Sequence, residues 1–182
     1  MGIPFEQRNF QKELDKKIAG FQKDGIVPTL LLHSCCAPCS SHCIEYLSDY
    51  FHITVFYYNP NISAEEEYRK RVEEQKRFIS EFPAKYKVSF IEGDYDTKEF
   101  YDIAKGYEQC REGGERCFRC YELRLKKTCE TAKAGGFDYF TTTLTISPLK
   151  NSVKLNEIGL KLSEEYDMPV SYTHLRAHET DS

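Results

Sequence analysis

Cysteines are the residues of this sequence whose spacing most clearly indicates chemistry. The stretch LLLHSCCAPCSSHC, residues 30–43, holds four of the eight cysteines, and two of them, Cys35 and Cys36, are adjacent. Adjacent cysteines seldom bond to each other, because the short ring strains the disulfide geometry. Cys117 and Cys120 form a C-x-x-C motif, whose i,i+3 spacing places both thiols on one side of a helix. Two distant segments thus offer thiols for one metal or redox centre.

Spacing alone leaves three interpretations of these thiols open. Four thiolates suit Zn²⁺ or an iron–sulfur cluster, and they would come from Cys35, Cys36, Cys117 and Cys120. Zinc sites more often use two C-x-x-C motifs. The adjacent pair Cys35 and Cys36 does not match that pattern. Cys39 forms a further C-x-x-C with Cys36 after an apolar run, which is typical of a thioredoxin-like disulfide centre. That interpretation leaves the remaining thiols unexplained.

Alternating strand and helix patterns predict the fold that must position these segments. Runs rich in β-branched and aromatic residues predict strands at 28–34, 53–58, 87–93 and 137–145. Helical periodicity predicts an N-terminal helix within 8–25 and further helices at 40–51, 64–82, 96–106, 117–134 and 147–167. This alternation predicts an α/β fold: a Rossmann-like, HUP-type parallel sheet of four or five strands with helices on both faces.

Polar segments follow several of the predicted strands, where parallel sheets place their sites. The cysteine segment, NPN at 59–61, EGDYD at 92–96 and TTTLTISP at 141–148 all occupy such positions. Asp96 suits a helix cap, whereas Asp94 is a candidate ligand or acid. His33, directly before the cysteines, is more typical of a buried histidine whose hydrogen bonds are satisfied.

Length and charge limit the class of protein. The 182 residues, 40% of them hydrophobic, suit a single domain, predicted over residues 1–170. No apolar run approaches the roughly 20 residues that a membrane span needs, and the polar N-terminus does not resemble a signal peptide. We therefore expect a cytoplasmic protein with reduced thiols and no membrane partner. The net charge is −4, although residues 111–133 hold seven basic and four acidic side chains.

Five segments of the chain carry a resemblance to a known family, and they are LLHSCCAPCSS, FYYNPNI, EGDYD, EGGERCFRCYELRL and TTTLTISPLKN. Over about residues 8–170 the chain resembles the QueH family of epoxyqueuosine reductases. The resemblance implies a tRNA-modifying oxidoreductase of queuosine biosynthesis. Its substrate would be a tRNA that carries epoxyqueuosine at the wobble position, and its cofactor would be a [4Fe–4S] cluster.

The resemblance also implies roles for individual residues. Carried over by position, the cluster ligands would be Cys35, Cys36, Cys117 and Cys120. Cys39 would bind a second iron or act as a redox partner, and Asp94 could protonate the epoxide oxygen. No G-x-G-x-x-G or P-loop motif occurs, so we expect an external electron donor.

Substrate contacts are expected around this centre. A base of an anticodon loop can leave its stack, and Tyr57 or Tyr58 could stack on it, with core packing as the alternative. The basic side chains of 111–133 could hold phosphates. A zinc-stabilised tRNA-binding module and a thiol–disulfide oxidoreductase remain the other two functional interpretations.

The C-terminal segment departs from the family pattern. Family members end with a C-x-C pair, and no cysteine follows Cys129 in this chain. Residues 171–182, SYTHLRAHETDS, lack apolar periodicity and resemble a non-native tail in place of the native C-terminus. We therefore expect His174 and His178 to have no function.

Overall fold

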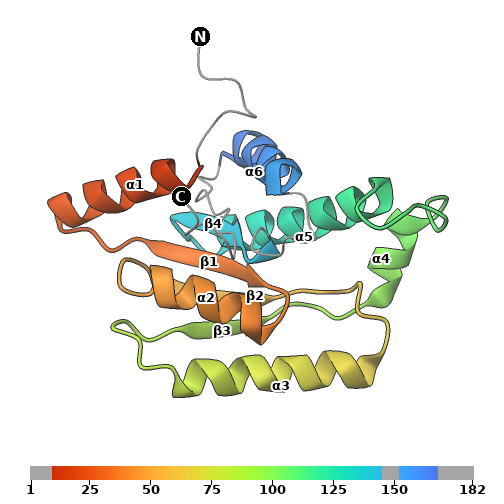
Figure 1. Ribbon diagram of the computed structural model, residues 1–182, viewed down its shortest axis with the longest axis horizontal. Helices are drawn as coiled ribbons and strands as arrows, with labels where there is room; N and C mark the ends of the chain where they lie inside the picture. The colour runs from red at the N-terminus through yellow and green to blue at the C-terminus, as the bar shows by residue number, and fades with distance from the viewer. Residues whose placement is uncertain (1–9, 145–151, 168–182) are drawn as a thin grey trace, which may run out of the picture.

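The computed structural model describes residues 10–144 and 152–167 of the chain. Helices and strands alternate along it, as the sequence pattern predicts (Figure 1). The elements are α1 (Phe10–Asp24), β1 (Thr29–Ser34), α2 (Ala37–Leu47), β2 (His52–Tyr57), α3 (Glu65–Glu81), β3 (Ser89–Glu92), α4 (Thr97–Ala104), α5 (Glu115–Ala134), β4 (Tyr139–Thr142) and α6 (Ser152–Tyr166). None of these helices is both long and apolar enough to cross a membrane.

The described strands form a four-stranded, wholly parallel sheet in the order β3-β2-β1-β4. This confirms the predicted α/β, Rossmann-like fold. The predicted domain boundary at 170 and the tail 171–182 lie outside the described residues. In the register, Leu32 of β1 pairs with Val55 of β2 and with Thr141 of β4. β1 therefore lies in the interior of the sheet, and its carboxyl end meets those of both neighbours.

Side chains of β1 alternate between the two faces of the sheet, as the period of a strand requires. Leu30 and Leu32 are fully buried in one core with side chains of α1, α2 and α3. Leu31 is fully buried in a second core with side chains of α5 and α6. Helices therefore cover both faces, as predicted.

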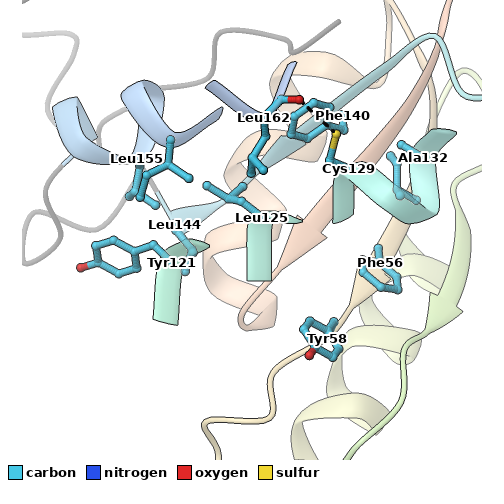
Figure 2. Packing of buried hydrophobic residues seen from close by; sticks show 12 residues of the cluster. Phe56, Tyr58, Tyr121, Leu125, Cys129, Ala132, Phe140, Leu144, Leu155 and Leu162 are labelled. Carbon is cyan, nitrogen blue, oxygen red and sulfur yellow. Dashed lines mark hydrogen bonds between the residues drawn. The ribbon is translucent and has the colours of Figure 1, made fainter. Parts of the chain in front are cut away.

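The second core ties α5 to the sheet (Figure 2). Leu125 and Cys129 of α5 pack with Phe140 of β4, and α6 covers them through Leu155 and Leu162. The thiol of Cys129 lies 3.8 Å from the carbonyl oxygen of Leu162, so this cysteine serves the core. Burying one side chain of this size contributes about 1.5–3 kcal/mol. The packing of α5 against the sheet fixes this helix relative to β1. The N-terminal end of α5 lies on the side of the sheet toward which β1 runs (Figure 1).

His33 connects three strands below the cysteine segment and is fully buried. Its Nε2 donates to the carbonyl oxygen of Tyr58 at 2.8 Å, and its Nδ1 lies 3.0 Å from Oγ1 of Thr142. A carbonyl only accepts, so Nε2 carries the proton and Nδ1 accepts from the threonine hydroxyl. Burial, reinforced by the nearby charge of Arg124, lowers the pKa of His33 to about 4. The ring is therefore a neutral structural connector.

We predict that His33 makes the fold acid-sensitive. Its pKa is lower in the folded chain than the ordinary 6.5, so the unfolded chain binds the proton more readily. The stabilisation is complete above about pH 6.5 and is lost as the pH falls toward 4, by about 3 kcal/mol in total. Urea unfolding of wild type and His33→Gln across this range measures the difference. Parallel pH curves for the two proteins would contradict the prediction.

Candidate metal centre

The first cysteine segment spans the turn from β1 into α2. Cys36 is the N-cap residue of α2, and Pro38 lies in the first turn, where proline needs no amide partner. The helix therefore begins at Ala37, earlier than the predicted residue 40, and includes Cys39 in its first turn. The sulfur atoms of Cys35, Cys36 and Cys39 all lie within 4.8 Å of one another. Three thiols thus converge from one short segment.

Hydrogen bonds between side chains and its own backbone hold this segment against the ends of β2 and β4. The amide of Asn59 donates to the carbonyl oxygen of Ser34 at 2.8 Å, and the hydroxyl of Tyr57 donates to that of Cys35 at 3.3 Å. The N–H of Cys35 donates to Oγ1 of Thr143, also at 3.3 Å. Contacts from two flanking strands therefore fix the direction in which the thiols point.

Gln75 of α3 braces the same segment at both of its ends. Its Oε1 accepts from Ser34 Oγ at 2.6 Å and from Ser40 Oγ at 3.0 Å, and all three side chains are fully buried. Ser34 and Ser40 immediately flank the three-cysteine segment. A buried network of this kind resists movement, because each bond that it loses leaves a costly unsatisfied group. The signal in the sequence is a glutamine three residues after Val72, on the buried side of α3.

The second cysteine pair lies at the beginning of α5. Cys117 and Cys120 are three residues apart in its first turns, as the spacing predicts. The N–H of Gly113 donates to the sulfur of Cys117 at 3.3 Å. Gly113 has a φ of +86°, a conformation that favours glycine. The sequence EGGER therefore builds the turn that presents Cys117.

Both cysteine segments line one cavity of about 560 Å³. Its walls include all five thiols named above, together with Asn59, Arg124 and Tyr101. The predicted meeting of the segments is thus observed as a common cavity, while the tightest group of sulfurs is Cys35, Cys36 and Cys39. A set of soft thiol donors around a partly enclosed space fits a zinc ion or an iron–sulfur cluster. The four-cysteine ligand set itself stays a prediction.

The electrostatic surroundings favour a thiolate among Cys35, Cys36 and Cys39. Hydrogen bonds from Cys36 and Cys39, aided by Thr143 and the charge of Arg124, hold the pKa of the Cys35 thiol well below its usual value despite burial. The same sulfur–sulfur contacts raise the pKa of Cys36 and Cys39. Of these three thiols, Cys35 therefore most favours the thiolate, which is the form that binds metals.

The acidic residues of the cavity differ from the predicted one. Asp94 is exposed and is not part of the cavity wall, so its role as an acid stays a prediction. Asp96 caps α4 by accepting from the N–H of Lys98 at 3.0 Å, as expected. Glu108 and Glu112 line the cavity instead. Sequence reasoning missed them because both lie in a loop without periodicity.

The aromatic residues near the cavity correct another expectation. Tyr57 and Tyr58 are both fully buried, so neither can stack on an incoming base, and the core-packing alternative is confirmed. Tyr101 of α4 instead lines the cavity and is 54% exposed. The sequence does not single out Tyr101, because one aromatic residue on an amphipathic helix is normally assigned to the hydrophobic core.

Comparison with known proteins decides the family. The model of the family described as Epoxyqueuosine reductase QueH matches residues 30–181. The chain belongs to the QueH family. It is similar to the epoxyqueuosine reductase QueH of Streptococcus pyogenes serotype M1, with 39% identity over 90% of this chain and 65% of that protein. The QueH protein of Staphylococcus epidermidis is also 39% identical, over 88% of this chain and 69% of its own length.

A more distant QueH protein also aligns over most of the chain. The protein of Thermotoga maritima is 34% identical over 81% of this chain and 75% of its own length. This chain thus spans about two thirds to three quarters of the length of these curated relatives.

Proposed function

We propose that this QueH chain reduces epoxyqueuosine to queuosine at the wobble position of tRNA with a [4Fe–4S] cluster. The reaction removes the epoxide oxygen as water: two C–O bonds break, a C=C bond forms, and two electrons and two protons are consumed. The observation that carries the proposal is the single cavity lined by both cysteine segments, in a chain of the family named for this reaction.

Four of the five thiols would hold the cluster. We assign Cys35, Cys36, Cys117 and Cys120, because they come in two pairs from the two segments that line the cavity. The cluster would supply electrons one at a time. Cys39 would then bind a second iron or serve as a redox partner. All eight cysteines are free, which suits the reducing cytoplasm, where an external donor would return the electrons.

Residues of the chain itself would supply the protons. Glu108 and Glu112 line the cavity beside Arg116. The backbone N–H groups of Glu108 itself and of Gly106 bind the Glu108 carboxylate and lower its pKa, so Glu112 is the one that could protonate the departing oxygen. Asp94 would be the alternative acid. Arg116 lies 3.9 Å from Glu112 and donates to the carbonyl oxygen of Glu108 at 3.1 Å. Arg116 thus contacts the carboxylate of Glu112 and the backbone of Glu108.

The substrate would enter as a base turned out of the anticodon loop. Enzymes that modify a base commonly extrude it into a pocket. The exposed ring of Tyr101 at the cavity offers a surface for stacking. Arg111, Lys126 and Lys133 are exposed on or beside α5 and could contact phosphates.

Anaerobic purification tests the assignment of the cluster. We expect a brown protein with about four irons and matching sulfide per chain, which converts epoxyqueuosine in tRNA when a chemical reductant is added. Cys117→Ser should lose most of its iron, whereas Cys110→Ser should keep it, because Cys110 is not part of the cavity wall. A colourless zinc protein would favour the tRNA-binding module. A metal-free protein with a reducible Cys36–Cys39 pair would favour the thiol–disulfide oxidoreductase.

Tyr101 provides a separate prediction about substrate binding. Stacking on one base is worth about 1–3 kcal/mol, so Tyr101→Ala should raise KM by roughly 5- to 150-fold while Tyr101→Phe stays near wild type. Because the side chain is largely exposed, neither change should disturb folding. Steady-state kinetics on tRNA measures the effect. An unchanged KM in the alanine variant would exclude this role.

A further inference from the structure

Arg124 is the most unusual charge of the described structure. It lies on α5 among the buried residues and is only 4% exposed. Its Nη1 donates to Oδ1 of Asn59 at 3.3 Å, and its Nε has no hydrogen-bond partner. Among the described residues, no carboxylate lies within ion-pair distance of it. Burying an unpaired guanidinium is costly, so the fold alone does not explain this arginine.

The position of Arg124 indicates what its charge serves. It lines the same cavity as the five thiols. The other two arginines of the cavity wall are paired: Arg116 of α5 lies 3.9 Å from Glu112, and Arg71 of α3 lies 2.8 Å from Glu67. An uncompensated cation thus faces the place where anionic sulfur gathers.

We propose that Arg124 is a positioning residue whose charge balances an anionic metal–thiolate centre bound in the cavity. The inference rests on the proposed function for the identity of that centre. A [4Fe–4S]²⁺ core with four thiolates carries two net negative charges, and one-electron reduction adds another. A fixed cation nearby therefore stabilises the reduced state more than the oxidised state and raises the reduction potential.

Two measurements on Arg124→Met test this charge role. Without metal, the variant should melt at or above the temperature of wild type, because it no longer buries an unpaired charge. Loaded with iron and sulfide, it should have a more negative midpoint potential in an EPR-monitored redox titration. Arg124→Lys keeps the charge and should stay close to wild type. Lys126→Met removes an exposed charge from the same helix and is the matched control.

Each alternative result has a definite meaning. A metal-free Arg124→Met that fails to fold, or melts well below wild type, would show that Arg124 serves the fold and would overturn the inference. Equal midpoint potentials for wild type and Arg124→Met would overturn it as well. If wild type binds zinc and takes up no iron, the proposed function fails. The inference then still requires weaker zinc binding in Arg124→Met than in Lys126→Met.

Discussion

The packing of α5 against the sheet is the interaction on which the cysteine cavity depends. Leu125 and Cys129 bury one side of this helix against Phe140 and Leu31, and its first turns then carry Cys117 and Cys120 to the cavity. The other segment reaches the same place because β1 ends between β2 and β4. Neither segment alone offers four cysteines to the cavity. An ordinary apolar contact thus sets the geometry of the cysteine cavity.

Around this centre the chain combines rigid support with an unusual balance of charge. Gln75 and Asn59 hold the first cysteine segment through buried hydrogen bonds, and Thr143 holds it through a half-buried one. His33, directly beneath it, stays neutral, because burial lowers its pKa. Arg124 is therefore the buried cation beside the sulfurs. A neutral His33 and one fixed cation, Arg124, together suit a cavity that would bind an anionic centre.

Patterns that depend on neighbouring residues predicted much of the structure. The alternation of strands and helices indicated the parallel sheet, and the i,i+3 spacing of Cys117 and Cys120 placed both thiols on one side of α5. Burial was harder to predict, because it depends on which elements meet in space. Tyr57 and Tyr58 carry the same side chain as Tyr101, yet only the latter is exposed at the cavity. In the sequence, Arg124 looks like one member of a basic surface patch, because a run of charges does not show which side of α5 is buried.

Anomalous diffraction at the iron edge, from crystals grown without oxygen, tests the central claim most directly. The account predicts one strong peak between the two cysteine segments, with Cys35 and Cys36 on one side and Cys117 and Cys120 on the other. No peak between the two segments, with iron held by the first segment alone or outside the cavity, would contradict this claim. The centre would then not depend on bringing the two segments together.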